Sequence, residues 1–299
     1  MTEYSRKTNS QRVTVLGLGK MGSALAGALL AKGFHVTVWN RNPDKTLALM
    51  ADGAHVASSP DMAIRASTTT IICVSNYEAC MQIFHSANVA SAIKGRVLLQ
   101  LSSGTSKDAR SLNTWITSHG AELLTGGIAA WPSQIGTNEA FITIAGRMNV
   151  FDQQKYMLQA LAGTVSLVGE DPGASAVLTN AAMAYLAGNW IGFCHGALIC
   201  DSEGIRVDEF GKLMESFSIM LSTEARQMGE VIQKGRFDEA KTTIETVAND
   251  LALLLRQSEE ASLNTELPTL FASIFKKAVN AGYHKEGHAA IIKVLRTAR

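Results

Sequence analysis

The sequence predicts an α/β fold in which a doubly wound parallel sheet is followed by one long helix and then by an all-α region. A glycine-rich turn joins a strand to a helix near the start of the chain, and strands and helices then alternate. Residues 173–200 contain no charged side chain, and the pattern after them is helical. We expect four segments: a flexible arm at 1–11, the sheet domain at 12–170, the long helix at 171–201 and a helical domain at 202–299.

Composition favours a soluble protein. The chain has 299 residues, enough for two domains, and its formal net charge of +1 indicates neither a nucleic acid nor an anionic membrane as a partner. The first residues are polar and lack the apolar core of a signal peptide. The four cysteines, Cys73, Cys80, Cys194 and Cys200, show no metal-binding spacing. We therefore expect buried, reduced thiols in a cytoplasmic protein without a metal site.

The turn after the first predicted strand, residues 12–16, carries a dinucleotide-binding pattern. It reads Gly17-Leu18-Gly19-Lys20-Met21-Gly22, with a helix and a second strand, at 34–39, behind it. Gly17 permits the tight turn, Gly19 lets the backbone approach a pyrophosphate, and Gly22 lets helix and strand pack closely. A glycine-rich turn alone is a weak signal. The flanking elements make it a prediction of a Rossmann domain, with phosphate at the helix N-terminus.

The end of the second strand predicts which dinucleotide is bound. An NAD site would place Asp or Glu there to hold the ribose hydroxyls, but this chain has Asn40 and Arg41. The Arg41 guanidinium can bind a 2′-phosphate with paired donors, Asn40 adds a neutral donor, and Lys45 adds charge. A solvated polar loop is the alternative, and Asp44 is a minor objection. We expect NADPH.

Further strands are predicted near His55 and at 69–74, 97–101, 122–125, 141–145 and 165–168. Ligands of such sheets lie beyond the carboxyl ends of the strands. We therefore expect cofactor contacts in the loops that follow the strands at 69–74 and 97–101. The expected residues are Val74, Ser75, Asn76, Ser102 and Ser103. For each serine alone, a helix cap is the commoner role. Residues 126–136, GGIAAWPSQIG, are too apolar for an exposed loop and suit the wall of a pocket.

The uncharged run at 173–200 is either a membrane span or a buried helix. As a helix it would be about 42 Å long at ~1.5 Å per residue. Glycines spaced by four residues, from Gly188 to Gly196, favour a membrane helix. Polar residues inside the run, such as Thr179 and Asn180, and the lack of a flanking basic cluster oppose it. We expect a connecting helix that is buried on nearly all sides.

Apolar residues in the last third recur with helical spacing, at 210–219, 231–232, 244–255, 267–278 and 288–295. A long uncharged helix that leads into such a region suggests partner helices from a second chain. We therefore expect a homodimer with its sites between the subunits.

Together these features resemble a known family. The segments GLGKMG, VWNRNPDK, LSSGTSKDAR and GGIAAWPSQIG, the long helix and the closing GYHKEGHAAIIKVLR are similar to those of the NADPH-dependent imine reductases. These enzymes belong to the 3-hydroxyacid dehydrogenase and 6-phosphogluconate dehydrogenase superfamily. The resemblance implies an intertwined dimer in which hydride passes from NADPH to a cyclic imine or iminium carbon, in a cleft between the Rossmann domain of one subunit and the helices of the other. We expect the substrate pocket at Ala130, Trp131, Pro132, Met183 and Met220.

The long helix also bears on the chemistry. In the 3-hydroxyacid dehydrogenases, the runner-up family, a lysine six residues after a glycine moves the hydroxyl proton. Counted from Gly173 that position is Thr179, and residues 173–200 contain no lysine. Oxidising an alcohol needs a group that accepts a proton, whereas an iminium ion needs only hydride, so C=N reduction is favoured.

Many imine reductases carry Asp or Tyr where this chain has Thr179. Neither Thr179 nor the following Asn180 titrates near neutral pH, so we expect one of them to hydrogen-bond the substrate nitrogen or a water. The alternatives are that Thr179 bonds back to its own helix and that Asn180 is a satisfied core amide. The missing carboxylate also leaves open an NADPH-binding sensor without turnover.

Asp250 is a further candidate catalytic residue. It is a lone carboxylate in the apolar stretch VANDLAL, and the resemblance implies that its helix borders the partner's cleft. Desolvation there would raise its pKa and let it donate a proton. A helix-surface charge is the alternative. His195, on the long helix, is expected to be a hydrogen-bonded core residue.

Overall fold

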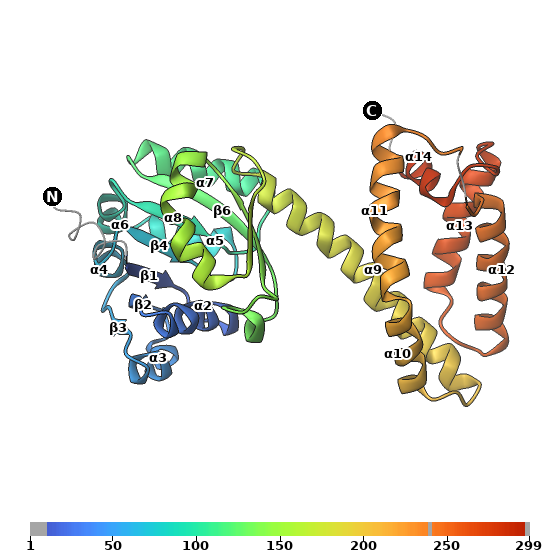
Figure 1. The fold of residues 1–299 in the computed structure, drawn as a ribbon, viewed down its shortest axis with the longest axis horizontal. Coiled ribbons are helices and arrows are strands. Elements are labelled where there is room, and N and C mark those ends of the chain that lie inside the picture. Colours follow the sequence, from blue (N-terminus) through green and yellow to red (C-terminus); the bar gives the residue numbers. More distant parts are fainter. Residues whose placement is uncertain (1–10, 239–240, 297–299) are drawn as a thin grey trace. The chain divides into compact units, whose positions relative to one another are not determined.

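The computed structural model describes residues 11–238 and 241–296 (Figure 1). The chain divides into two compact units, and the division falls between Ala184 and Tyr185. The first unit holds the sheet and the second is helical. The predicted arm at 1–11 lies outside the described residues except for Gln11. The predicted domain boundaries stay predictions, because the division falls inside one helix.

The first unit is built on an eight-stranded sheet in the order β3-β2-β1-β4-β5-β6-β7-β8. Neighbouring strands are parallel except β6 and β7, which are antiparallel. The order reverses between β1 and β4, the switch point at which such sheets bind ligands. The strands are β1 (Arg12–Leu16), β2 (His35–Trp39), β3 (His55–Val56), β4 (Thr69–Ile72), β5 (Val97–Gln100), β6 (Glu122–Ala129), β7 (Phe141–Ala145) and β8 (Thr164–Leu167).

Helices cover both faces of the sheet because the central strands are apolar on both sides. Val15 and Ile71 belong to the core under α2 (Lys20–Ala31) and α8 (Met148–Leu161). Their neighbours Leu16 and Ile72 belong to the opposite core, since successive strand residues face opposite sides. Helices on that side are α4 (Pro60–Arg65), α5 (Tyr77–Phe84), α6 (Ala87–Ala92) and α7 (Ser106–Ser118); the short elements are η1 (Pro43–Thr46), α3 (Leu47–Ala51) and η2 (Pro132–Gln134).

The structure confirms the predicted fold class and every predicted strand, although the bounds of β2, β4, β5 and β8 differ from the predicted ones by one or two residues and the end of β6 differs more. β6 runs four residues beyond its predicted end and stops at Ala129, because residues 126–129 pair with β7 from Ile144 to Phe141. Residues 126–129, the first four of the eleven predicted as a pocket wall, are therefore strand, and pairing within the sheet explains their apolar character. Trp131, in the same segment but two residues beyond the end of β6, is 66% exposed in this chain.

The second unit contains the helical stretches that the sequence predicts. Its elements are α10 (Val207–Ser216), α11 (Ser218–Lys234), α12 (Ile244–Glu260), α13 (Glu266–Asn280), η3 (His288–Ile291) and α14 (Ile292–Leu295). Its fully buried core is small and consists of Ile244, Ala278 and Ala290, with partly buried aromatic side chains around it. Much of its apolar surface is therefore left uncovered within one chain.

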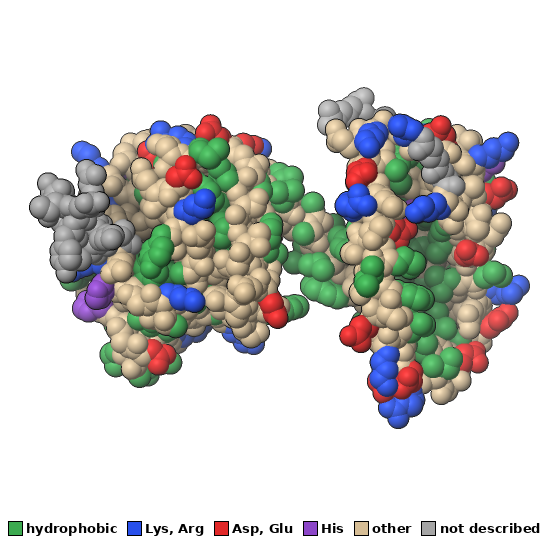
Figure 2. Space-filling view, viewed as in Figure 1, with side chains coloured by type: hydrophobic (Ala, Val, Ile, Leu, Met, Phe, Trp, Pro, Cys, Tyr) green, Lys and Arg blue, Asp and Glu red, His purple; other side chains and the backbone are tan. Residues whose placement is uncertain are grey.

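The long helix α9 (Ala174–Ser202) forms as predicted, but the expectation that it is buried on nearly all sides is wrong for a single chain. Figure 2 shows hydrophobic side chains along it, and Leu186, Trp190 and Ile191 are all exposed. Among the described helices, α9 is the one long and apolar enough to cross a membrane, a test that core helices of soluble proteins also pass. His195 is buried, and its Nε2 lies 3.0 Å from the hydroxyl oxygen of Ser258, as expected for a core histidine.

The four cysteines are free thiols. Burial raises the pKa of Cys73 to about 11 and that of Cys80 to about 12, so both are neutral at pH 7. Cys200 is half-buried. Cys194 is exposed, contrary to the expectation of buried thiols, because it lies on the uncovered part of α9.

Candidate cofactor and substrate site

The glycine turn has the geometry that a dinucleotide needs. Gly17 has a φ of +91°, and a Cβ there would lie 2.4 Å from the carbonyl oxygen of Cys73. A Cβ at Gly22 would lie 2.0 Å from the carbonyl oxygen of Gly17, so α2 reaches the turn only because no side chain intervenes. A Cβ at Gly19 would meet nothing within 4 Å. The turn is closed on its inner side and open at Gly19, where a pyrophosphate would approach.

The N-terminus of α2 is suited to an anion. Its N-cap is Gly19, which offers no side-chain cap, and its first turn contains no acidic residue. The first N–H groups of a helix have no partner in the helix, and its dipole favours negative charge there. Leu18 is buried, Met21 is half-buried and Lys20 is exposed. These features fit the phosphates of a dinucleotide.

Asn40 has a role beyond the predicted one. Its Oδ1 accepts a hydrogen bond from the backbone N–H of Leu18 at 2.9 Å, and its Nδ2 donates to the carbonyl oxygen of Asn42 at 2.8 Å. Asn40 therefore holds the glycine turn against the end of β2. One amide hydrogen remains for the predicted contact with a phosphate.

Arg41 and Lys45 are both exposed beyond the end of β2. Within the described ranges neither side chain forms an ion pair or a hydrogen bond, so both charges are available to a ligand. The loop between them is shaped by Asn42, whose Oδ1 accepts from the backbone N–H of Asp44 at 3.0 Å. Two unpaired cations and no carboxylate at the strand end fit a ribose 2′-phosphate.

The loops after β4 and β5 are tied together. The Ser102 hydroxyl accepts a hydrogen bond from the backbone N–H of Val74 at 3.0 Å, and Ser102 is buried. Asn76 caps α5 by accepting from the backbone N–H of Ala79 at 2.8 Å. The side chains of Ser102 and Asn76, both predicted to contact the cofactor, are therefore already hydrogen-bonded within the protein. Ser75 and Ser103 are exposed at this edge, and their predicted cofactor contacts stay predictions.

The start of α9 packs closely on the sheet at Thr179. Its hydroxyl donates to the carbonyl oxygen of Ser175 at 2.9 Å, and a Cβ on Gly127 of β6 would lie 2.0 Å from that hydroxyl oxygen. Ser175 is buried, and its hydroxyl oxygen lies 2.8 Å from the hydroxyl oxygen of Thr143 on β7. Thr179 therefore bonds back to its own helix, the alternative weighed above, and fills space that Gly127 leaves empty.

Asn180, the next residue, faces the loop after β5. Its Nδ2 donates to the carbonyl oxygen of Gly104 at 3.1 Å, and its side chain is exposed. Gly104 packs against the ring of Tyr77, where a Cβ would lie 2.2 Å from a ring carbon. The structure thus brings one predicted catalytic residue to the loop that carries predicted cofactor residues. It is not the satisfied core amide of the alternative interpretation.

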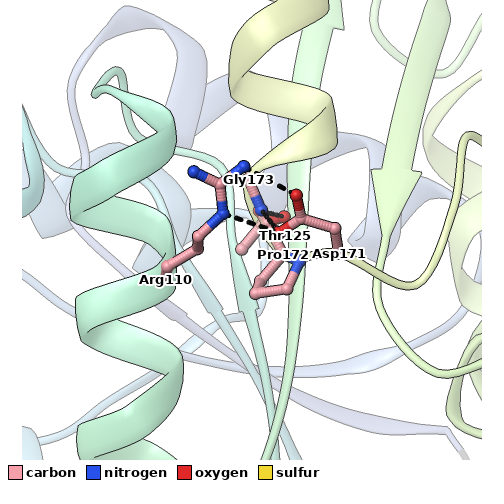
Figure 3. A network of polar contacts seen from close by, with 5 residues as sticks. All are labelled: Arg110, Thr125, Asp171, Pro172 and Gly173. Carbon is pink, nitrogen blue, oxygen red and sulfur yellow. Dashed lines mark hydrogen bonds and ion pairs between the residues drawn. The ribbon is translucent and has the colours of Figure 1, made fainter.

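A second contact, which sequence reasoning missed, anchors the beginning of α9 (Figure 3). Arg110 of α7 donates to both carboxylate oxygens of Asp171, at 3.0 and 2.7 Å, and the backbone N–H of Gly173 donates to the same carboxylate at 2.9 Å. Thr125 donates its hydroxyl proton to the carbonyl oxygen of Pro172 at 2.6 Å. The hydrogen bonds from Arg110 and from the Gly173 N–H lower the pKa of Asp171 to about 2. The stretch that enters α9 is held at each of three successive residues.

The remaining predicted site residues are surface positions in one chain. Ala130 and Pro132 are half-buried near the end of β6, and Met183 on α9 is 49% exposed. Met220 is in the second unit, where it lines a groove of about 700 Å³ beside α11 and η3. Asp250 is exposed on α12 with no partner among the described residues, so its predicted desolvation depends on another chain.

Comparison with known proteins agrees with this geometry. A family model for the NAD binding domain of 6-phosphogluconate dehydrogenase matches residues 12–169. The fold and the glycine turn therefore define a nicotinamide-dinucleotide-dependent oxidoreductase. A second model, for the C-terminal domain of NADPH-dependent reductive aminase-like proteins, matches residues 171–297. The chain belongs to the NADPH-dependent imine reductase family of the 3-hydroxyacid dehydrogenase and 6-phosphogluconate dehydrogenase superfamily.

Individual relatives support the same assignment. The NADPH-dependent reductive aminase of Aspergillus oryzae is 26% identical over 97% of this chain and 99% of its own length. An imine reductase from Myxococcus stipitatus, solved in complex with NADP+, has a TM-score of 0.90 and 29% identity, over 95% of this chain and 100% of that one. A reductive aminase from Aspergillus terreus, in complex with NADPH and ethyl levulinate, has a TM-score of 0.89 and 28% identity, over 95% and 99% of the two chains. The predicted cofactor, NADPH, is confirmed.

Proposed function

We propose that this protein reduces the C=N bond of cyclic imines and iminium ions to amines. Bound NADPH would supply hydride to the iminium carbon, and the C=N π electrons would become the lone pair on the amine nitrogen. The chain's own contribution is to hold the dinucleotide by the glycine turn and the Arg41 loop, and to place substrate beside Thr179 and Asn180. Asp250 of a partner subunit is a candidate proton donor within this proposal.

The observation that carries the proposal is the uncharged start of α9. Thr179 and Asn180 lie beside the sheet edge that carries the glycine turn and the loops after β4 and β5. Residues 173–184, at the start of this helix, supply no lysine, aspartate, glutamate or histidine. Such a wall lacks a base that could take a proton from an alcohol. An iminium ion arrives with its positive charge in place and needs only hydride.

We further propose a homodimer with the site between subunits, in the cytoplasm. The exposed apolar side chains of α9, among them Leu186, Trp190 and Ile191, support a covering partner surface. Met183 and Met220 lie in different units, and a partner chain offers a way to bring both to one substrate. The free cysteines agree with a reducing compartment.

The test is turnover of a simple cyclic imine. Purified protein with NADPH and 2-methyl-1-pyrroline or 3,4-dihydroisoquinoline should show loss of NADPH absorbance and formation of the cyclic amine. Gly22→Ala serves as the control that removes cofactor binding. NADPH binding without turnover across a panel of imines would support the sensor instead. Turnover of 3-hydroxyacids with NADP+ would support the dehydrogenase.

A further inference from the structure

We infer that Asn180 accepts a hydrogen bond from the substrate nitrogen through its side-chain oxygen, and so selects imines whose protonated form carries an N–H bond. This inference rests on the proposed reduction of C=N bonds and specifies the substrate class. It assigns Asn180 to the substrate and leaves Thr179 as a residue that positions α9.

The orientation of the Asn180 amide follows from its partner. The carbonyl oxygen of Gly104 can only accept a hydrogen bond, so the amide NH₂ group must face it across the 3.1 Å contact. The Oδ1 atom must then face away from Gly104. Among the residues that the structure describes, this oxygen has no hydrogen-bond partner, and the side chain is exposed. Asn180 therefore presents its Oδ1 as a free acceptor, and the hydrogen bond of its amide nitrogen to Gly104 fixes the direction of that oxygen.

The acceptor lies at the ligand-binding edge of the sheet. Gly104 belongs to the loop after β5, and Ser102 of that loop accepts from the N–H of Val74 in the loop after β4. β4 is next to β1, and the turn after β1 packs on the β4 loop, since a Cβ on Gly17 would meet Cys73 and Val74. Asn180 is thus bonded into the same set of loops that the glycine turn contacts.

Thr179 cannot fill this role without losing its present contacts. Its hydroxyl proton is donated to Ser175, and its oxygen packs against the backbone of Gly127 at a separation that excludes even a methyl group. To meet a substrate, the side chain would have to rotate and leave a gap above β6. Asn180 needs no such change.

The chemistry of the substrate nitrogen matches a neutral acceptor. A protonated imine carries an N–H bond with positive charge, and a hydrogen bond from a charged donor is stronger than one between neutral groups. An N-alkylated iminium ion carries the same charge but has no N–H to donate. Because an amide oxygen does not titrate, it orients the C=N bond without taking the proton. The predicted consequence is discrimination between two iminium ions of similar shape.

The experiment compares protonated 3,4-dihydroisoquinoline with N-methyl-3,4-dihydroisoquinolinium. The wild type should have a kcat/KM for the N–H substrate about tenfold or more above that for the N-methyl substrate. Asn180→Leu keeps the side-chain volume but removes the acceptor, so it should lower kcat/KM for the N–H substrate about tenfold and leave the N-methyl substrate nearly unchanged. Retention of the full preference in Asn180→Leu would show that size alone excludes the methyl group and would overturn the inference.

A binding measurement separates this inference from the activity itself. Calorimetry on the enzyme with NADP+ should show protonated tetrahydroisoquinoline binding about tenfold more tightly than its quaternary N,N-dimethyl analogue, and Asn180→Ala or Asn180→Leu should remove the difference. Equal binding of both ligands by the wild type would also overturn the inference. The absence of imine turnover by the wild type would instead refute the proposed function.

The matched control is Asn149→Leu. Asn149 is exposed on α8, which begins after β7, and β7 is antiparallel to β6, so it ends at the opposite edge of the sheet. The same substitution there should leave both kcat/KM values and both affinities unchanged. If Asn149→Leu also lost the discrimination between the N–H and the N-methyl substrates, the effect would come from general destabilisation, and this result would count against the role of Asn180.

Discussion

Thr179→Ala should relieve the cost of Gly127→Ala, because the Cβ added at residue 127 and the hydroxyl oxygen of Thr179 compete for the same space. A Cβ on residue 127 would lie 2.0 Å from the Thr179 hydroxyl oxygen, and its next neighbours are the hydroxyls of Thr143 at 3.1 Å and Ser175 at 3.2 Å. Overpacking of this kind costs about 1–3 kcal/mol of unfolding free energy. Thr179→Ala removes the clashing oxygen and leaves contacts that small shifts can accommodate. We therefore expect Gly127→Ala to cost less than ~1 kcal/mol in that background, a coupling of about 1–2 kcal/mol.

Urea unfolding of the wild type, both single variants and the double variant measures this coupling. Thr179→Ser is the matched control, because it keeps the oxygen and its bond to Ser175 and should give Gly127→Ala no relief. If the effects of Gly127→Ala and Thr179→Ala add to within about 0.5 kcal/mol, Thr179 does not occupy the space above Gly127. The assignment of Thr179 as the residue that docks α9 on β6 would then be wrong.

Three further outcomes follow from the same geometry. Arg41→Ala should weaken NADPH binding about tenfold or more by fluorescence titration, with little change for NADH, because the guanidinium meets only the 2′-phosphate; equal losses would contradict the cofactor assignment. Gly22→Ala should abolish tight NADPH binding, whereas Gly27→Ala, whose Cβ meets nothing within 4 Å on the same helix, should stabilise the protein by about 0.5–1 kcal/mol in thermal unfolding. Hydrogen bonds from Arg110 and from the Gly173 N–H lower the pKa of Asp171 from its ordinary 3.8 to about 2. The stability advantage of wild type over Asp171→Asn, measured by urea unfolding across pH, should therefore be constant above about pH 5 and shrink as the pH falls from about 4 to 2; an advantage that persists at pH 2 would contradict the ion pair.

The sequence alone determined the features that rest on short-range pattern. Runs of apolar residues and the turns between them predicted the strands of the sheet, because a strand buried on both faces must be apolar throughout. The spacing of Gly17, Gly19 and Gly22 after β1 predicted the dinucleotide turn, since backbone conformation and close approach at those positions are local properties. Arg41 at the end of β2 predicted NADPH by the same local argument.

Only the tertiary structure decided which polar atoms remain free for ligands. Asn40 reads as a phosphate donor in the sequence, but in the structure its oxygen accepts from the N–H of Leu18 and its amide nitrogen donates to Asn42, which leaves one amide hydrogen for a phosphate. Arg110 and Asp171 are separated by 61 residues, and nothing in their local sequences indicates that they pair. Thr179 and Asn180 were both candidates from the sequence. The structure distinguishes them, because the Thr179 hydroxyl donates to Ser175, whereas the Asn180 amide donates to Gly104 and its oxygen has no partner among the described residues. Hydrogen-bond partners across a fold depend on which loops meet in space, and a linear pattern of residue types does not contain that information.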